Sequence, residues 1–354
     1  MSEKKRKRKE KSAGLSNSRQ NYPKFGKSDP NPLAHKGKGL VKVRNPLGRN
    51  GSGYKISKKK LKEVQLSNNA QVKVSVDRVT LMGQPIGDET IDCDRVMHLL
   101  YKKFKNADFY KQAASGFNIV DPKTDENVAY VEVPTHRTDE IRVDFNPKRL
   151  RWDLTSEWAQ FLIWFLQQLE NKKFSRLDLA FDMIDVDVKG YLPYVFGASK
   201  SLFYDRAWNL GTIYAGARSS KSQIRFYDKK AERKHAGYEV KDLSFWRLEL
   251  QLRGNRTEIW RDDCAKKLGQ FYKLEPHGVK NLNDKVLLLA MKQDPNIYKE
   301  FSKNTQTKIR KMMKQPDNQE YTVTRMLLYC LEENYEKLEQ ELNFYLAEFG
   351  IEKD

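Results

Sequence analysis

The chain has few cysteines and no long hydrophobic run, and each shortage excludes a class of protein. Its three cysteines, Cys93, Cys264 and Cys330, are odd in number and widely spaced, which is typical of reduced thiols and not of a disulfide framework or a zinc site. No apolar segment is long enough to span a bilayer. The basic run at 4–9 is not followed by an apolar region, so a secretory signal is not expected. We therefore expect a cytoplasmic protein without a membrane partner.

Acidic side chains are outnumbered, and the excess of positive charge is concentrated near the N-terminus. The chain has 66 Lys and Arg against 47 Asp and Glu, a formal charge of +19. Residues 1–60 hold 19 basic and three acidic side chains, so this segment carries +16 and the remainder only +3. This distribution favours an arm that binds nucleic acid through its charge, although a solubilising or localising tail is an alternative. Residues 1–65 are rich in Gly, Pro, Ser, Asn and Lys, and we predict that they are disordered.

Hydrophobic periodicity predicts an α+β fold, and the folded part of the chain is expected to begin near Ala70. The first part, 70–254, is expected to form an antiparallel β-sheet with flanking helices, and 255–350 is expected to be a helical region. Thr155 or Ser156 is the expected N-cap of a helix with Glu157 in its first turn. The predicted strands are 71–82, 116–121, 128–134, 140–146, 174–182, 210–216, 222–229 and 244–253. The predicted helices are 92–106, 155–170, 257–268, 279–293, 296–314 and 320–348.

Four predicted strands share an unusual pattern, in which an apolar face alternates with a face of arginines and carboxylates. In one of them Tyr227 lies between Arg225 and Lys229 on the polar face, where a tyrosine flanked by cations could meet a phosphate. If the four strands belong to one sheet, that sheet has a polar face lined by arginines, carboxylates and this tyrosine. The four segments are 141–146, 176–182, 223–230 and 246–253.

These segments also resemble motifs of the trans-acting plasmid Rep family, the rolling-circle replication initiators of Gram-positive plasmids, to which relaxases of some integrative conjugative elements are related. The matching motifs are Arg142-Val-Asp-Phe-Asn-Pro147, Arg176-Leu-Asp-Leu-Ala-Phe-Asp182, Ile224-Arg-Phe-Tyr-Asp-Lys-Lys-Ala-Glu-Arg233 and Trp246-Arg-Leu-Glu-Leu-Gln-Leu252. They occur in the family's order, and the resemblance covers roughly 70–350. Several spaced motifs that agree are far more specific than one.

The resemblance implies that Tyr227 is a catalytic nucleophile. Such a tyrosine attacks a DNA phosphodiester, forms a 5′-phosphotyrosyl bond and frees a 3′-OH, which conserves the bond energy for rejoining. Arg225, Lys229 and Arg247 are then the expected phosphate-binding residues. From spacing alone, a tyrosine packed at the edge of the sheet would be the more ordinary interpretation of Tyr227.

A divalent metal ion, Mg²⁺ or Mn²⁺, is expected to assist this chemistry. The five histidines include no His-x-His pair, the metal-binding arrangement of another large class of nicking enzymes, so carboxylate ligation is expected. Both ions prefer oxygen ligands, and Asp178, Asp182 and Glu249 lie on the polar faces of strands predicted to neighbour Tyr227; Asp77 and Asp144 are further candidates. The alternative is that each carboxylate pairs with an arginine of a neighbouring strand.

Recognition of an origin sequence would need a second surface, and the basic segment 299–314 is the candidate. Asn and Gln can read adenine edges while cations hold phosphates, and the resembled family maps origin discrimination to a basic segment at this position. An ordinary solvated charged helix face is the alternative. The candidate recognition residues are Lys303, Asn304, Gln306, Lys308, Arg310 and Lys311.

Taken together, these features predict a metal-dependent tyrosine enzyme that nicks and rejoins DNA, like a topoisomerase, to initiate rolling-circle replication of a plasmid. Expected partners are origin DNA in duplex and single-stranded form, a second copy of the chain as a homodimer, and a host helicase. The helicase is expected because the chain has no G-x-x-x-x-G-K-[ST] phosphate loop. A relaxase of a conjugative element and a non-catalytic DNA-binding replication or copy-control protein are the alternatives.

Overall fold

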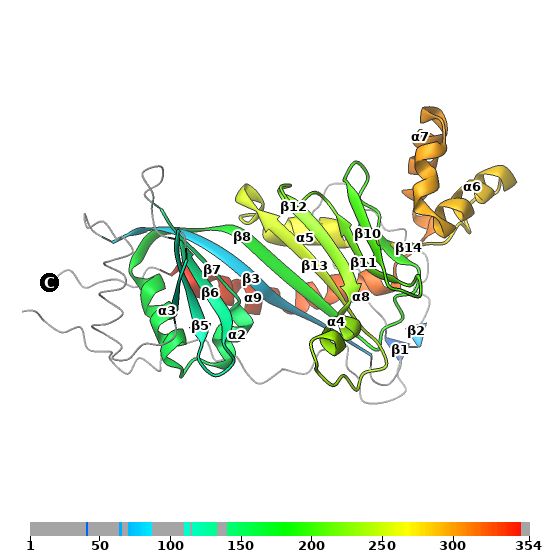
Figure 1. Ribbon diagram of the computed structural model, residues 1–354. Coiled ribbons are helices and arrows are strands. Elements are labelled where there is room, and N and C mark those ends of the chain that lie inside the picture. The colour runs from blue at the N-terminus through cyan, green and yellow to red at the C-terminus, as the bar shows by residue number, and fades with distance from the viewer. Residues whose placement is uncertain are drawn as a thin grey trace, which may run out of the picture.

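A large antiparallel sheet organises the part of the chain that the computed structural model describes: residues 70–86, 110–113, 115–132 and 140–347, with two short strands at 40–41 and 64–65. Figure 1 shows this sheet running through the molecule. Within the described residues it has ten strands, all paired antiparallel. Their spatial order is β10 (Lys200–Tyr204), β11 (Leu210–Ala215), β12 (Ser222–Asp228), β13 (Phe245–Arg253), β8 (Leu169–Ile184), β3 (Gln71–Pro85), β7 (Ile141–Phe145), β6 (Glu126–Glu132), β5 (Gly116–Asp121) and β4 (Tyr110–Ala113).

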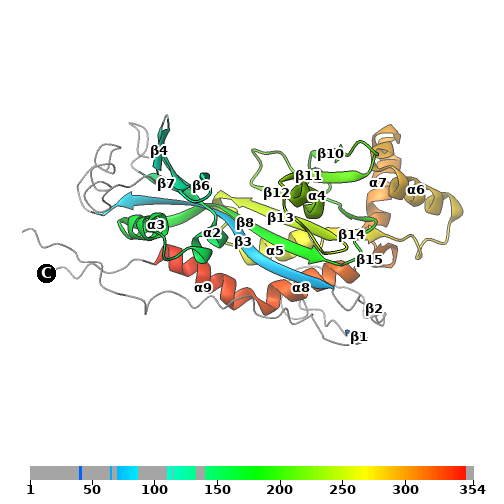
Figure 2. The ribbon, with the colours of Figure 1, turned by 60° about the horizontal axis from the view of Figure 1, so that its bottom comes forward.

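One face of the sheet is the main hydrophobic core, because apolar residues alternate with polar ones along its central strands. On β12 and β13 these residues include Ile224, Phe226, Leu248 and Leu250, all buried. Four helices cover this face, as Figure 2 shows, and they share one core cluster with the strands. The helices are α3 (Glu157–Gln167), α5 (Trp260–Leu268), α8 (Thr322–Glu333) and α9 (Tyr335–Leu346). The opposite face is left for polar side chains.

Two short helices border the polar face. Helix α2 (Pro147–Trp152) follows β7 and packs against β3, and α4 (Lys229–His235) follows β12 and packs against β13. Asn146 caps α2 through Oδ1, which accepts hydrogen bonds from the backbone N–H groups of Lys148 and Arg149. Asp228 caps α4 in the same way. Both helices therefore begin where a strand of the sheet ends.

A second hydrophobic cluster lies at one end of the sheet, where α6 (Leu282–Gln293) and α7 (Lys303–Met313) project from it (Figure 1). Ile309, Met312 and Met313 anchor α7 in this cluster. The small three-stranded sheet of β9 (Tyr191–Pro193), β14 (Phe271–Leu274) and β15 (Gln319–Glu320) links it to the main core. The short 3₁₀ helices are η1 (Gly254–Arg256), η2 (Pro295–Glu300) and η3 (Pro316–Asn318).

The predicted α+β class with an antiparallel sheet is confirmed, and most predicted strands occur within a few residues of their expected bounds. Ser156 is the N-cap of α3, since its Oγ accepts a hydrogen bond from the backbone N–H of Ala159 at 3.3 Å. Glu157 lies in the first turn, as expected. None of the helices in the described residues is long and apolar enough to cross a membrane.

Several predictions after residue 254 were wrong. The expected helix at 296–314 is divided into η2 and α7, because the chain is extended at Phe301 and Ser302 Oγ caps a new helix. The expected helix at 320–348 is divided at Asn334 into α8 and α9. The strands β14 and β15 interrupt a region predicted to be wholly helical. Before residue 254, the sequence analysis also missed β9, β10, α2 and α4.

The predicted division of the chain at 254 and 255 stays a prediction. Helices α5, α8 and α9 pack in the same core as the sheet, whereas α6, α7 and η2 pack in the second cluster. The predicted helix at 92–106 lies outside the described residues. So does most of the predicted disordered segment 1–65, in which the structure describes β1 (Leu40–Val41) and its antiparallel partner β2 (Val64–Gln65).

Candidate active site

The pairing of β12, β13 and β8 brings three of the four predicted segments together on the polar face. Tyr227 lies opposite Arg247, and Arg225 lies opposite Glu249. On the other side of β13, Arg247 lies opposite Asp182. The fourth segment, β7, is separated from them by β3, and its Asp144 accepts two hydrogen bonds from Arg78 at 2.6 and 2.7 Å.

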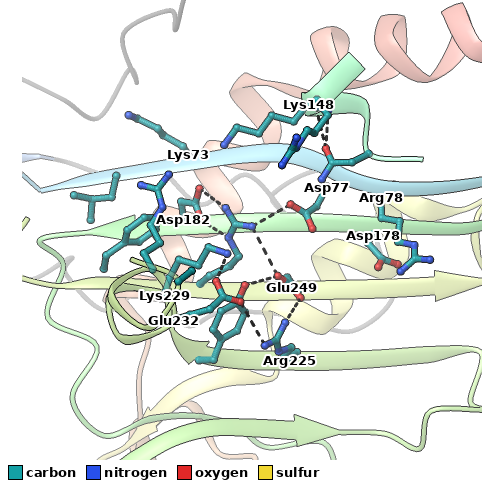
Figure 3. Close-up of a pocket in the computed structure, with 18 of the residues that line it drawn as sticks. Lys73, Asp77, Arg78, Lys148, Asp178, Asp182, Arg225, Lys229, Glu232 and Glu249 are labelled. Atoms are coloured by element: carbon teal, nitrogen blue, oxygen red, sulfur yellow. Dashed lines mark hydrogen bonds and ion pairs between the residues drawn. The ribbon is translucent and has the colours of Figure 1, made fainter. Parts of the chain in front are cut away.

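Arg247 is the centre of this face, although only 6% of it is exposed. Its Nε and Nη2 donate to the two carboxylate oxygens of Asp182 at 2.5 and 2.9 Å, and its Nη1 donates to Asp77 Oδ1 at 3.0 Å. Glu249 Oε1 lies 3.8 Å from the same Nη1. Figure 3 shows Asp77, Asp182 and Glu249 grouped around this guanidinium. Three carboxylates thus share one arginine, which sets their positions.

Asp77 reaches this group because β3 has a bulge at that point. Val76 pairs with Leu179 and Arg78 pairs with Asp178, which leaves Asp77 as an extra residue without a partner in the ladder. A bulge of this kind redirects the side chains around it. It adds a carboxylate, 25% exposed, to the side of Arg247 that faces Glu249.

The hydroxyl of Tyr227 donates a hydrogen bond to Glu249 Oε1 at 2.7 Å. The guanidinium carbon of Arg225 lies 3.8 Å from the centre of the Tyr227 ring, and Lys229 Nζ lies 5.5 Å from it. Arg225 Nη1 also donates to Glu249 Oε2 at 3.4 Å. The nucleophile predicted from the sequence and two of its predicted phosphate ligands therefore form one contact group with a carboxylate.

The environment of this pair favours a neutral phenol. Burial raises the pKa of Tyr227 far above its ordinary value, and the negative charge of Glu249 raises it further. Burial also raises the pKa of Glu249, while the hydrogen bond from Tyr227 opposes that rise. The phenol thus keeps its proton near neutral pH and holds it toward a carboxylate whose basicity is increased.

The three predicted metal ligands are not grouped together. Asp178 accepts hydrogen bonds from Arg176 at 2.6 and 2.9 Å, and Asp182 is held by Arg247. Within the described residues, no three His, Cys, Asp or Glu side chains are placed to hold a metal ion together. Asp77 and Glu249 are the better pair for a divalent cation because they lie next to one another: Arg247 Nη1 donates to Asp77 Oδ1 at 3.0 Å and lies 3.8 Å from Glu249 Oε1, and the charge of Asp77 raises the pKa of Glu249. Mg²⁺ commonly takes one or two protein carboxylates together with substrate phosphate oxygens.

Tyr227 and Glu249 belong to the lining of an open cavity of about 810 Å³ over the polar face. The cavity extends from α2 to α4 across the intervening strands, and cations outnumber carboxylates in its lining by nine to six. This excess suits a polyanion. The cations are Lys73, Arg78, Lys148, Arg149, Arg176, Arg225, Lys229, Arg233 and Arg247, and the carboxylates are Asp77, Asp178, Asp182, Glu232, Asp242 and Glu249. The contributions of α2 and of the end of α4 were missed in the sequence.

The predicted recognition residues lie on α7, outside the lining of this cavity. Lys303, Asn304, Lys308, Arg310 and Lys311 are exposed, whereas Gln306 is half-buried. The side-chain amide of Gln306 donates to the carbonyl oxygen of Phe301 at 2.8 Å, which ties it to the start of the helix. Lys308 forms an ion pair with Asp284 of α6, and Arg310 donates to the hydroxyl of Tyr298.

Comparison with known proteins agrees with the resemblance seen in the motifs. A replication initiation protein of Staphylococcus aureus is 30% identical over 215 residues, which cover 59% of this chain and 65% of that relative. A second replication initiation protein of the same species is 29% identical over 221 residues, 60% of this chain and 66% of the relative. The chain is thus similar to replication initiation proteins over these segments. It spans just under two thirds of the length of these two relatives.

No family model matches the chain. Among solved structures, a rolling circle replication initiator protein from Geobacillus stearothermophilus aligns with 63% of this chain and 96% of its own length. The TM-score is 0.38 and the sequence identity is 18%. The similarity to known proteins therefore rests on the segments shared with the replication initiation proteins of Staphylococcus aureus, and the structural alignment adds no support.

Proposed function

We propose that this chain is a plasmid rolling-circle replication initiator that nicks and rejoins one strand of its origin, with Tyr227 as the nucleophile. The observation that carries the proposal is the 2.7 Å hydrogen bond from the Tyr227 hydroxyl to Glu249 in a cation-rich cavity. The similarity to replication initiation proteins supports the biological role. Since plasmid origins of Gram-positive bacteria are cytoplasmic, the proposal also places the protein in the cytoplasm.

In the proposed reaction Glu249 acts as the general base. Glu249 takes the phenolic proton as the Tyr227 oxygen attacks the phosphorus atom of a DNA phosphodiester. The bond from phosphorus to the 3′ oxygen breaks, and that oxygen takes a proton from water to leave as a 3′-OH. The 5′ phosphate stays on Tyr227, and attack by a 3′-OH on the phosphotyrosine reverses these steps and rejoins the strand.

The three predicted phosphate-binding residues differ in what they can reach. Arg225 and Lys229 lie beside the Tyr227 ring with side chains partly open to the cavity, so we assign them to the attacked phosphate. Arg247 is almost fully buried and saturated by carboxylates. Its proposed role is to position Asp77, Asp182 and Glu249, so it acts on the reaction through them.

Mg²⁺ or Mn²⁺ is a further part of the proposal, held by Asp77 and Glu249. Such an ion would supply charge neutralisation at the phosphate. Asp178 and Asp182, which the sequence also suggested, are assigned to their arginine partners. Origin recognition is proposed for the exposed residues of α7, outside the cavity, and a host helicase and a homodimer remain proposed partners.

The test replaces Tyr227 by phenylalanine, which removes only the hydroxyl. With Mg²⁺ or Mn²⁺ and a supercoiled plasmid that carries the cognate origin, the wild-type protein should produce open circles and a covalent bond to the 5′ end. The Tyr227→Phe variant should produce neither and should still bind the origin.

Tyr214→Phe is the matched control. Tyr214 lies on the same polar face of the neighbouring strand and contacts Arg225, but the phenol that donates to Glu249 is that of Tyr227. This variant should cleave at the wild-type rate. Undiminished cleavage by Tyr227→Phe, or loss of cleavage in Tyr214→Phe alone, would assign the nucleophile elsewhere.

A further inference from the structure

Two aromatic side chains in the cavity are largely exposed, and the proposed chemistry does not use them. Trp152 of α2 is 71% exposed, and Tyr238, three residues after the end of α4, is 57% exposed. Single exposed apolar side chains are common on protein surfaces. Here two exposed aromatic side chains line the same cation-rich cavity as Tyr227. This combination suits a ligand that has flat apolar faces and negative charge.

Each aromatic ring is accompanied by a cation from its own segment. Lys148 Nζ lies 4.8 Å from the centre of the Trp152 ring, one helical turn away on α2. The guanidinium carbon of Arg233 lies 5.9 Å from the centre of the Tyr238 ring. A base that stacks on either ring would place its phosphates near a positive charge that is already there.

The segment that carries Tyr238 is fixed to the rest of the site. The backbone N–H of Tyr238 donates to the carbonyl oxygen of Arg233 at 3.0 Å. Lys230 Nζ donates to the carbonyl oxygens of Asp242 and Leu243 at 2.6 and 2.9 Å, which ties the end of this loop to α4. A loop whose backbone is held in place loses less conformational freedom when it binds a partner.

The two rings belong to different walls of the cavity. Helix α2 packs against β3, whereas α4 packs against β13, and β8 lies between those two strands. In Figure 3, Lys148 of α2 lies on one side of Asp77 and Asp182, and Lys229 and Glu232 of α4 lie on the other. A DNA strand that crosses from one wall to the other passes over β13, β8 and β3, which carry Arg247, Asp182 and Asp77, and Tyr227 lies next to them on β12.

We propose that Trp152 and Tyr238 stack on unpaired bases of the single DNA strand that carries the phosphate attacked by Tyr227. Base faces are accessible to a protein ring only when the bases are not stacked in a duplex. The cavity would therefore select unpaired origin DNA, and α7 would remain free to bind the duplex. This inference rests on the proposed function for its substrate, but its test needs no cleavage.

The experiment measures binding by the full chain with Tyr227→Phe in every variant, so that no strand is cut. The probes are a single-stranded origin oligonucleotide with 2-aminopurine beside the nick site and the corresponding closed duplex. Trp152→Ala and Tyr238→Ala should each weaken single-strand binding by roughly five- to one-hundredfold, from the usual range for loss of one stacked base. Duplex affinity should change by less than about twofold, since the duplex offers no base face.

Matched variants separate stacking from other effects. Trp208 is 83% exposed and does not line the cavity, so Trp208→Ala should bind both probes like the parent. Trp152→Phe keeps a flat ring and should retain most of the single-strand affinity. The quenching of 2-aminopurine by the parent protein should be lost in at least one of the two alanine variants.

Each of the following results would overturn the inference: unchanged single-strand affinity in both alanine variants, equal losses for single strand and duplex, an equal loss in Trp208→Ala, or a loss in Trp152→Phe as large as in Trp152→Ala. The last would indicate a damaged fold or a role for the indole alone. Capture of an acidic peptide in place of DNA would overturn it as well. Failure of Tyr227 as the nucleophile would be seen only in the cleavage assay, so the two proposals can fail separately.

Discussion

Replacing Glu249 by glutamine tests the proposed general base with little change in shape. Gln keeps an oxygen that can accept the 2.7 Å hydrogen bond from Tyr227, but it cannot take up the phenolic proton. Because the pKa of Tyr227 is raised far above its ordinary value, spontaneous loss of that proton cannot replace the base. Nicking should therefore fall by about 10²- to 10⁴-fold, the usual contribution of a general base.

The same substitution should leave the fold intact. Arg247 keeps Asp182 and Asp77, and Arg225 keeps Glu232 at 3.8 Å. The raised pKa of Glu249 means that the folded protein holds this proton more tightly than the unfolded chain, so ionisation of Glu249 lowers stability as pH rises. Replacement by Gln removes this pH-dependent loss of stability, but it also removes a negative charge that lies near Arg225 and Arg247. These effects oppose each other, and the free energy of unfolding should change by no more than about 1 kcal/mol.

The assay is single-turnover nicking of an end-labelled origin strand as a function of pH. The base works only when ionised, so the wild-type rate should fall as pH decreases through the pKa of Glu249, which burial raises and the proposed metal ion would lower. The Glu249→Gln variant should be slow at every pH and lack this limb. A variant that nicks within several-fold of wild type, or that keeps the same pH limb, would refute the assignment of Glu249 as the base.

Three further outcomes follow from the same contacts. Asp77→Asn should raise the Mg²⁺ or Mn²⁺ concentration needed for half-maximal nicking by about tenfold, with no change in origin affinity, because it removes one of the two proposed oxygen ligands; an unchanged metal titration would exclude Asp77. Arg247→Met should lower the free energy of unfolding in urea by about 3–5 kcal/mol, since Asp182 would stay buried without its partner; a loss below about 1 kcal/mol would contradict the central role of this arginine. Asn304→Ala should reduce the preference for the cognate origin over a related one in binding titrations, whereas Gln306→Ala should chiefly destabilise the start of α7; the reverse pattern would show that Gln306 reads the origin.

The strands that carry the nucleophile were predictable because their pattern is local. In β12 and β13 every second residue is apolar, so the sequence assigns each side chain to a face without knowledge of its neighbours. The order of the strands in the sheet was harder to predict from the sequence. The sequence alone could not place β3 between β8 and β7, which separates Asp144 from the site and brings in Asp77.

The bulge in β3 did leave a signal in the sequence. The apolar residues of this strand follow a spacing of two from Val72 to Val76 and resume at Val79, three residues later. A spacing of three inside an otherwise alternating strand indicates one extra residue. That reading places Asp77 and Arg78 on the same polar face, as the structure does. The start of α2 had a comparable signal, since Asn146 followed by Pro147 is typical of an N-cap and the first turn of a helix.

The partners of the carboxylates could not be predicted, because they depend on the register between strands. On this face most carboxylates meet an arginine: Asp178 meets Arg176, and Asp182 meets Arg247. A sequence that shows carboxylates and arginines in alternation does not say which pairs will form. The alternative interpretation, that these side chains are ion-pair partners, therefore fits Asp178 and Asp182.

Glu249 differs from the other carboxylates because of a small residue beside it. Its neighbour on β8 is Ala180, which cannot pair with it, and its neighbour on β12 is Arg225, whose guanidinium lies over the Tyr227 ring at 3.8 Å and reaches Glu249 at only 3.4 Å. The strongest hydrogen bond left to Glu249 is therefore the one from Tyr227. An arginine in place of Ala180 would face Glu249 across the ladder and neutralise it as Arg247 does Asp182. The absence of a charged side chain at that one position on β8 is what makes Glu249 available to the tyrosine as a base.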